Sequence, residues 1–335
     1  MLEFESHRLI EHMKKALIFG ISGQDGGYLA KLLLSKNYRV FGVSRDIKSS
    51  DFSNLKKLNV FNRVELLSGT PSNMRSVMRV LEKSDPHEVY NLSGQSSVSL
   101  SFKYPLETIE SIILGTQNLL DGIRCHNDKI RLFNSCSTEC FGDTGNEIAD
   151  EMTAFSPKSP YSVAKATSFW QVSTYRDAYG IFACSGIMSN HESPLRPIRF
   201  VTQKIISSAC RISKGSDERL YLGNLNIERD WGWAPEYVDA MWLMLQHSEP
   251  IDFIIATGKS TPLKELVDKI FSVLNLDYRD YLDTKSDLLR PSDFKVSRVS
   301  PMRAKNLLGW YAQVNIDSIV SRLVESKLNE ECAQN

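Results

Sequence analysis

Short apolar runs alternate with longer amphipathic stretches through the first 185 residues of the chain. Each apolar run is four to six residues long and is bounded by polar or glycine residues, as in a strand buried on both faces. The runs predict strands at residues 16–19, 39–43, 64–67, 88–92, 130–134 and 183–188. The stretches between them predict helices at residues 28–35, 72–83, 105–124 and 162–179.

This alternation predicts an α/β fold, in which helices cover both faces of a parallel sheet. After about residue 190 the apolar runs shorten and are separated by Pro and Gly, with helices predicted at 200–214 and 261–274. We therefore expect an N-terminal extension at 1–13, a sheet domain at 14–190 and a smaller C-terminal α/β lobe at 191–330. A chain of 335 residues exceeds the usual size of one hydrophobic core, which agrees with this division.

Composition and charge narrow the class of protein. Hydrophobic residues make up 42% and charged residues 24% of the chain, as in folded globular proteins. The 40 Lys and Arg residues balance the 40 Asp and Glu residues, so no overall charge attracts nucleic acid or an anionic membrane surface. Any site for an anion must then be local.

The six cysteines include no CxxC pair and no His or Cys grouping with zinc spacing, so we expect reduced thiols and no metal site. No stretch approaches the roughly 20 apolar residues of a membrane span. The first residues lack the apolar core of a signal peptide. These features predict a cytoplasmic protein.

A glycine-rich loop follows the first predicted strand and precedes the first predicted helix. It reads GISGQDG, with Gly20, Gly23 and Gly26 at its glycine positions. Glycines in this place allow the backbone to turn tightly and to approach a pyrophosphate at the positive end of the helix. The spacing alone is weak evidence, but its position between strand and helix predicts dinucleotide binding and a Rossmann-type, doubly wound sheet.

The end of the second predicted strand bears on the choice of dinucleotide. An acid there binds the ribose 2′-hydroxyl of NAD, whereas an Arg suits the 2′-phosphate of NADP. Ser44 occupies the acid position and Arg45 follows it, which favours NADP. Asp46 comes next, so a shift of one residue would favour NAD, and a solvated surface pair is a further alternative.

Tyr161 and Lys165 are four residues apart in a segment that is predicted to be helical, so they share one face. An ammonium group beside a phenol favours the phenolate. It therefore brings a pKa of about 10 towards a value that is useful for proton abstraction.

The predicted strand at 130–134 leads into Ser137, Thr138 and Glu139, which a parallel sheet would present at the same crevice as Tyr161. An alcohol oxidation needs only the hydroxyl group and the Tyr. The carboxylate of Glu139 allows a second proton transfer, which separates dehydratases from reductases. Its alternative role is to cap the next element.

Further short motifs extend this pattern from residue 14 to residue 325. They include GISGQDGGYL at 20–29, YNL at 90–92, STE at 137–139, SPYSVAK at 159–165, NHESP at 190–194, FVT at 200–202, YLGNL at 221–225, RDWG at 229–232 and RP at 290–291. Together they resemble the extended short-chain dehydrogenase/reductase family, and within it the GDP-mannose 4,6-dehydratases.

The resemblance implies a reaction in which Tyr161, tuned by Lys165, removes the C4 hydroxyl proton while hydride passes to the cofactor. Ser137 would hydrogen-bond that hydroxyl. Glu139 would then abstract the C5 proton, which the 4-ketone acidifies, and assist loss of the C6 hydroxyl as water. Hydride returns to C6, so the product is a 4-keto-6-deoxy sugar and the cofactor is regenerated.

The resemblance also implies binding residues, a GDP-sugar substrate and a homodimer or homotetramer. The cofactor, NADP before NAD, would be bound by Gly20, Gly23, Gln24, Asp25, Gly26, Arg45, Leu92, Gln95, Ser96, Tyr161, Lys165, His191 and Arg196. The substrate, bound mainly by the C-terminal lobe, would contact Ser137, Thr138, Glu139, Asn190, Val201, Lys204, Arg229 and Arg290. The two guanidinium groups would suit a diphosphate.

Several positions depart from the family pattern and leave alternatives open. The family's catalytic Thr is Ser137 here, and other departures are Asp46, Gly69–Pro71, Glu107, Leu195 and Gln203. They bear on NADP choice, tetramer formation and the identity of the sugar. The alternatives are a dehydratase of another GDP-hexose or GDP-heptose, a nucleotide-sugar epimerase or 4-ketoreductase, and a catalytically silent dinucleotide-binding regulatory subunit.

Overall fold

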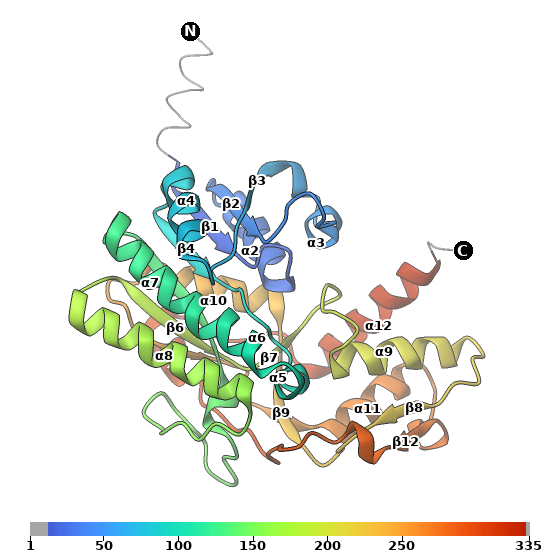
Figure 1. Ribbon diagram of the computed structural model, residues 1–335. Coiled ribbons are helices and arrows are strands. Elements are labelled where there is room, and N and C mark those ends of the chain that lie inside the picture. The colour runs from blue at the N-terminus through green and yellow to red at the C-terminus, as the bar shows by residue number, and fades with distance from the viewer. Residues whose placement is uncertain (1–12, 333–335) are drawn as a thin grey trace.

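A computed structural model describes residues 13–332 of the chain (Figure 1). The extension that we expected at residues 1–13 lies outside the described residues, Met13 excepted. The main sheet has seven strands, all parallel, in the order β10-β6-β5-β4-β1-β2-β3. Their bounds are β1 Lys15–Phe19, β2 Arg39–Ser44, β3 Val64–Ser68, β4 Glu88–Asn91, β5 Arg131–Ser137, β6 Ala183–Met188 and β10 Phe253–Ile255.

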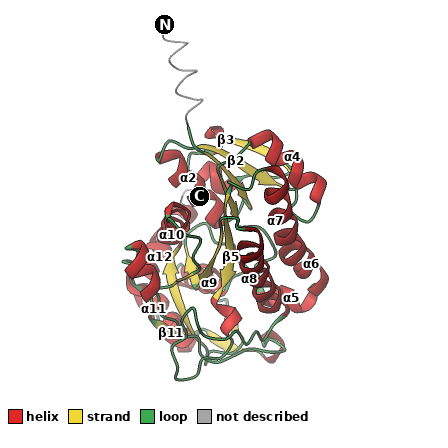
Figure 2. Cartoon of the chain, turned by 90° about the vertical axis from the view of Figure 1, so that its left-hand side faces the viewer, coloured by secondary structure: helices red, strands yellow, loops and turns green. Residues whose placement is uncertain are grey.

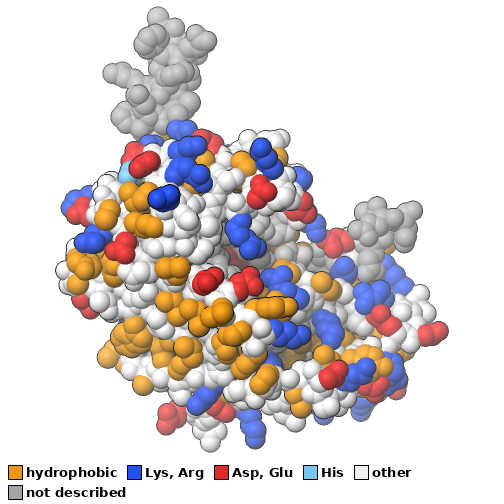
Figure 3. Space-filling model, in the orientation of Figure 1, with side chains coloured by type: hydrophobic (Ala, Val, Ile, Leu, Met, Phe, Trp, Pro, Cys, Tyr) orange, Lys and Arg blue, Asp and Glu red, His pale blue; other side chains and the backbone are white. Residues whose placement is uncertain are grey.

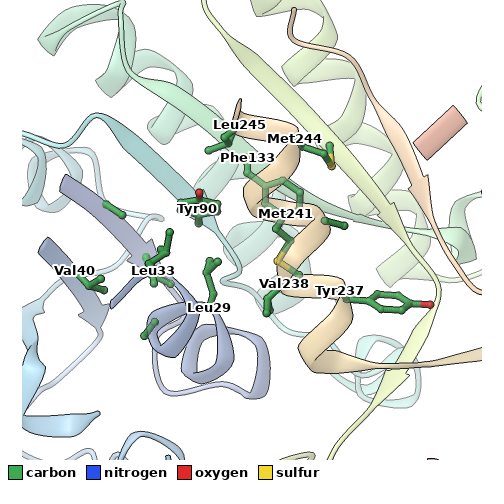
Figure 4. Close-up of a cluster of buried hydrophobic side chains, with 14 of the residues drawn as sticks. Leu29, Leu33, Val40, Tyr90, Phe133, Tyr237, Val238, Met241, Met244 and Leu245 are labelled. Atoms are coloured by element: carbon green, nitrogen blue, oxygen red, sulfur yellow. The ribbon is translucent and has the colours of Figure 1, made fainter. Parts of the chain in front are cut away.

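Helices cover both faces of this sheet (Figures 1 and 2). On one face lie α2 (Gln24–Ser35) and α10 (Ala234–Gln246), whose apolar side chains share a core with the sheet (Figure 4). On the other lie α4 (Met74–Ser84), α7 (Gly115–His126) and α8 (Pro160–Tyr179). Because both faces are covered, strands β1, β4, β5 and β6 are buried at nearly every position, which explains the apolar runs in the sequence.

The six strands predicted in the first 190 residues are all present, and the doubly wound α/β fold is confirmed. The first helix begins at Gln24 rather than at 28, because the glycine loop itself provides the first helical turn. The helix predicted at 105–124 is divided by a π-helical turn. Its parts are α6 (Pro105–Ile109), the π-helix Glu110–Leu114 and α7. Two short helices were missed, α3 (Ser53–Lys57) and α5 (Val98–Lys103).

The second lobe has its own hydrophobic core. Three helices enclose it, α9 (Val201–Ser213), α11 (Leu263–Val273) and α12 (Ile316–Cys332). Its strands are β7 Asn190–Glu192, β8 Leu220–Leu222, β9 Glu228–Trp233, β11 Ser260–Pro262 and β12 Leu282–Thr284. They form a three-stranded sheet, β11-β9-β7, and a two-stranded sheet, β12-β8. Among residues 13–332 no helix is long and apolar enough to cross a membrane.

The two lobes are interwoven along the chain, which differs from the simple division at residue 190. Strand β10 is an edge strand of the main sheet and pairs with β6. Helix α10 packs on α2, and Trp310 and Ala304 join the same core. The C-terminal half therefore supplies one strand and one covering helix of the first lobe.

Candidate active site

A cavity of about 1410 Å³ lies between the two lobes, at the carboxyl ends of the main strands. Figure 3 shows this face of the molecule hollowed near its centre, with Lys and Arg side chains gathered to the right of the hollow. All residues that we predicted to bind cofactor or substrate line the cavity, with one exception. Thr138 is only 6% exposed and is not among the lining residues, so its expected contact with substrate is not supported.

The glycine loop has the geometry that a bound pyrophosphate requires. Gly20 has φ of +86°, and a Cβ atom there would lie 2.6 Å from the carbonyl oxygen of Leu92. A Cβ atom on Gly26 would lie 2.4 Å from the carbonyl oxygen of Gly20. Helix α2 begins at Gln24 with no side-chain cap on its first turn, and the one acid of that turn, Asp25, is paired with His191, so the positive end of the helix faces the cavity.

Gln24 and Asp25 join the loop to the second lobe. Gln24 donates to the carbonyl oxygen of His191 at 3.2 Å and accepts from the Ser193 hydroxyl at 2.7 Å. Asp25 Oδ2 lies 3.0 Å from His191 Nε2, while His191 Nδ1 lies 2.7 Å from the carbonyl oxygen of Ser189. Gln24, Asp25 and His191 were predicted to bind cofactor, and in this structure they also hold the lobes together.

His191 is buried and Asp25 is half-buried, and each changes the pKa of the other. Burial opposes the Asp25 charge, but His191 outweighs it and the carboxyl pKa is lowered. Burial likewise acts to lower the pKa of His191, whereas the adjacent Asp25 carboxylate raises it above its ordinary value. The pair is therefore held as an ion pair within the wall of the cavity.

The residues at the end of β2 also face the cavity. Ser44, whose hydroxyl lies 3.0 Å from that of Ser50, presents a hydroxyl rather than a carboxylate at the end of β2, and Arg45 and Asp46 line the cavity beside it. Asp46 instead accepts the backbone N–H of Lys48 at 2.8 Å and caps its own loop. Arg45 lines the cavity, and no acid within residues 13–332 forms an ion pair with it. This arrangement leaves a cation available for a phosphate.

Tyr161 and Lys165 lie in the first two turns of α8, and both line the cavity. The helix begins after Ser159, which forms a reciprocal capping box with Ser162. Lys165 Nζ donates to the carbonyl oxygen of Ser135 at 2.6 Å and lies 3.1 Å from its hydroxyl. The ammonium group is 6.0 Å from the centre of the Tyr161 ring.

We expected Lys165 to lower the pKa of Tyr161, but in this structure the pKa is raised instead. Burial raises the pKa of Tyr161 well above its ordinary value, and the hydrogen bond with Ser137 offsets only part of that effect. Burial also lowers the pKa of Lys165, whose ammonium group is held by Ser135. The sequence argument considered only the Lys–Tyr pair and omitted the cost of placing a phenolate in a buried site.

Ser137 and Glu139 follow β5 directly. The Ser137 hydroxyl accepts the backbone N–H of Glu139 at 3.2 Å and caps a short 3₁₀-helix, Thr138–Phe141. The Glu139 side chain does not cap this element. Its carboxylate lies 3.3 Å from Arg229 Nε at the cavity wall, so the capping alternative is wrong.

Arg229 is 4% exposed, and protein acceptors surround its guanidinium group. It donates to Glu139, to Asp293 at 2.9 Å, and to the carbonyl oxygens of residues 228, 294 and 295. These contacts do not support the expectation that Arg229 binds a diphosphate. Among residues 13–332, Arg290 pairs with one acid, Asp293 at 3.4 Å, so its guanidinium group has fewer polar partners than that of Arg229.

The remaining predicted residues surround the mouth of the cavity. Lys204 donates to the carbonyl oxygen of Tyr221 at 2.6 Å, and burial lowers its pKa. Arg196 contacts the carbonyl oxygen of His191 and pairs with buried Glu192 at 3.4 Å. Leu92, Gln95, Ser96, Asn190 and Val201 also line the cavity.

Sequence reasoning missed two residues of the site. Ser135, which holds the Lys165 ammonium, is two residues before Ser137 in the same strand, and that alternation was a usable signal. Asp293 holds both Arg229 and Arg290. Only the fold brings Asp293 and Arg229 together, although the RP motif at 290–291 was close by.

Solved structures with the same fold were found by comparison of the whole chain. DesIV, a dTDP-glucose 4,6-dehydratase from Streptomyces venezuelae solved with NAD and TYD bound, superposes with a TM-score of 0.85 at 19% identity, covering 95% of this chain and 98% of that one. RMD from Pseudomonas aeruginosa, solved with NADPH, superposes with a TM-score of 0.76 at 19% identity, covering 95% and 98%. These likenesses show the class of fold: a doubly wound parallel sheet with a smaller second lobe, which here brings Tyr161 and Lys165 to one cavity.

Comparison of sequences identifies the family within that class. The family model described as GDP-mannose 4,6 dehydratase matches residues 17–323. GDP-mannose 4,6 dehydratase 1 of Arabidopsis thaliana is 38% identical over 332 residues, which cover 96% of this chain and 91% of the relative. The chain belongs to the GDP-mannose 4,6-dehydratase family.

Proposed function

We propose that this chain is a hydro-lyase that converts GDP-mannose to GDP-4-keto-6-deoxymannose. The observation that carries the proposal is the grouping of Ser137, Glu139, Tyr161 and Lys165 at one cavity, in a chain of this family. Tyr161 and Ser137 provide for oxidation at C4, and Glu139 provides for elimination across C5 and C6. An epimerase or 4-ketoreductase needs no carboxylate at the place of Glu139, which makes those alternatives weaker.

The residues of the chain have separate roles in this reaction. A nicotinamide dinucleotide held at the glycine loop would supply reversible hydride transfer, at C4 and then at C6. Tyr161 takes the C4 hydroxyl proton, and the Ser137 hydroxyl orients that oxygen by a hydrogen bond. Glu139 takes the C5 proton and passes it to the departing C6 hydroxyl, so that water leaves and the carboxylate is restored. The proton that C5 regains after reduction at C6 comes from solvent. The Lys165 ammonium, held by Ser135, supplies positive charge near the Tyr161 oxygen.

We further propose NADP rather than NAD as the cofactor. The uncapped start of α2 and the close-packed glycines fit a dinucleotide pyrophosphate. Ser44 in place of an acid, Asp46 bound to its own loop and Arg45 without an acidic partner among the described residues favour a 2′-phosphate. Mass spectrometry of cofactor released from purified protein tests this assignment, and NAD alone would contradict it.

The experiment that tests the function uses purified protein with GDP-mannose and no added cofactor. We expect a product that is 18 mass units lighter and carries a 4-ketone, since the elements of water are lost and the cofactor is regenerated. Other GDP-hexoses and a GDP-heptose are tested beside it, and Tyr161→Phe is the inactive control. Consumption of NADPH on a 4-keto sugar without dehydration would support a ketoreductase. Cofactor binding with no change in any GDP-sugar would support a silent regulatory subunit.

We also propose that the protein is at least a homodimer. Apolar side chains are exposed on α6, the following π-helix and α8, including Leu106 at 74% and Trp170 at 58%. Ile109, Leu114 and Val163 extend the same surface. Figure 3 shows hydrophobic side chains spread over this side of the molecule. A patch of this kind marks a protein interface, and a second copy of the chain would cover it.

The location that we propose is the cytoplasm. Residues 13–332 contain no disulfide bond, and the sulfur atoms of Cys136 and Cys140 lie 3.7 Å apart without forming one. Thiols in this state suit a reducing compartment. Imaging of a fluorescent fusion tests the proposal.

A further inference from the structure

Four side chains of alternating charge follow one wall of the cavity. They are Glu139, Arg229, Asp293 and Arg290, and successive members are 3.3, 2.9 and 3.4 Å apart. At one end of the row is Glu139, the carboxylate that the proposed function uses as a base. At the other end is Arg290, whose guanidinium group is available to a diphosphate. The inference below rests on that proposed function.

Arg229 is fixed more firmly than either of its carboxylate partners. A guanidinium group has five N–H donors, and here each has an acceptor. Nε contacts Glu139, Nη1 contacts two carbonyl oxygens, and Nη2 contacts Asp293 and a third carbonyl oxygen. Its cationic carbon also lies 3.8 Å from the centre of the Phe294 ring. Arg229 therefore acts as a part of the wall and has no donor left for substrate.

The two carboxylates do not share Arg229 equally. Asp293 contacts Nη2 at 2.9 Å, a full hydrogen bond, whereas Glu139 contacts Nε at the longer distance of 3.3 Å. A carboxylate that is tightly paired with a cation is a poor proton acceptor, because pairing stabilises the charged form. Asp293 takes up part of the Arg229 charge and so leaves Glu139 orientated but weakly paired.

We propose that Asp293 is a positioning residue for the elimination step. It holds Arg229 at the distance from Glu139 that orients the carboxylate without neutralising its basicity. Asp293 also contacts Arg290, so a diphosphate that draws Arg290 away leaves Asp293 free to bind Arg229 more closely. Substrate binding at one end of the row thereby loosens Glu139 at the other end, when the base is needed.

Asp293→Asn tests this role because it keeps the shape of the side chain and removes its charge. In the variant the positive charge of Arg229 falls on Glu139 alone. Proton removal from C5 should slow by about tenfold or more, since small displacements and stronger pairing of a base have effects of this size. Oxidation at C4 uses Tyr161 and should stay within about threefold of the wild-type rate, as should KM for GDP-mannose.

The measurements follow the two steps separately in purified holoenzyme with GDP-mannose. Absorbance at 340 nm reports oxidation at C4, and deuterium uptake from heavy water reports exchange at C5. Asp293→Glu should recover most of the C5 exchange. The control is Asp283→Asn, which removes an aspartate from an exposed pair with Arg219, neither of which lines the cavity. Its rates should equal those of the wild type.

Crystal structures of the wild type and Asp293→Asn, each with GDP, give a readout that does not depend on activity. We expect Arg229 to turn towards Glu139 in the variant and to approach Asp293 in the GDP-bound wild type. An unmoved Arg229 would overturn the inference, as would equal loss of C4 oxidation and C5 exchange. A wild-type protein that dehydrates no GDP-sugar would instead contradict the proposed function, and the position of Arg229 would still decide this inference.

Discussion

At the scale of the single residue, Glu139 separates the proposed reaction from a simple oxidation. Glu139→Gln keeps the hydrogen bond to Arg229 possible but removes the proton acceptor. We expect binding of GDP-mannose and of cofactor to persist, with slow partial oxidation at C4. Formation of the dehydrated product should fall by about 10²- to 10⁴-fold, the usual contribution of a general base. Product analysis by mass spectrometry checks this, and full activity in the variant would remove Glu139 from the mechanism.

The pairing of Asp25 with His191 makes the stability of the folded protein depend on pH in a predictable direction. The pKa of His191 is raised in the folded protein above its ordinary 6.5, so its contribution to stability is complete below pH 6.5. That contribution is lost as pH rises through the folded value. The pKa of Asp25 is lowered from 3.8, so its contribution is present above pH 3.8 and is lost in acid below that range.

Asp25→Asn should therefore abolish the part of the pH dependence of stability that comes from the Asp25–His191 pair. Between about pH 6 and pH 8.5 the wild type should lose on the order of 1 kcal/mol of stability relative to the variant. Urea unfolding at both pH values measures the difference. Asp85→Asn is the control, since Asp85 lies 3.9 Å from His126 at an exposed position. Parallel pH curves for the wild type and Asp25→Asn would contradict the assignment.

The sequence was sufficient for the residues whose spacing reflects local structure. Tyr161 and Lys165 are one helical turn apart, and Ser137 and Glu139 follow a strand end, so their convergence follows from the parallel sheet. Asp293 was not predicted because a 64-residue separation from Arg229 has no local signature. The Tyr161 pKa was misjudged for the related reason that burial depends on the whole surrounding fold.

At the scale of the element, the start of α8 matters most, because Tyr161 lies in its first turn. Ser159→Ala removes the capping hydroxyl that accepts the Ser162 N–H at 3.1 Å. We expect a loss of about 1 kcal/mol in the free energy of unfolding, with a fall in turnover as Tyr161 loses its fixed position. Thr167→Ala is the control, because this exposed hydroxyl bonds within the same helix and caps nothing. Equal stability of the two variants in urea would show that the cap is unimportant.

Strands and helices were predicted correctly where the pattern of apolar and polar positions was long enough to show its periodicity. Strands β1 to β6 are apolar runs flanked by turns, and the structure has all of them. Strand β10 has three residues, Phe253–Ile255, too few to distinguish a strand from any apolar run. Helix α10 is longer, but its pattern does not reveal that it crosses back to cover α2. In the second lobe the helices predicted at 200–214 and 261–274 are present as α9 and α11, whereas its strands of three to six residues and helix α12 were not predicted.

At the scale of the whole molecule, the exposed apolar surface on α6 and α8 predicts association. Trp170→Glu should place a charge in the dimer interface and shift the protein towards monomer by tenfold or more in dissociation constant, about 1.4 kcal/mol or greater. Light scattering after size-exclusion chromatography measures the mass. Val273→Glu is the control, an exposed apolar residue on α11 in the other lobe. A wild type that is monomeric at all concentrations would contradict the prediction.

Strand β10 and helix α10 complete the first lobe although they come late in the chain, and this order has a consequence for synthesis on the ribosome. The first six strands emerge before β10 and α10, so one edge of the sheet and one side of α2 have no partner at that stage. At about 5 to 20 residues per second, translation from Met188 to Ile255 takes roughly 3 to 13 seconds. During this interval the nascent sheet exposes apolar surface and an unpaired strand edge, both of which favour aggregation. The interval is therefore one in which a chaperone would protect the chain, and a product that stops short of Ile255 would be unable to complete its first core.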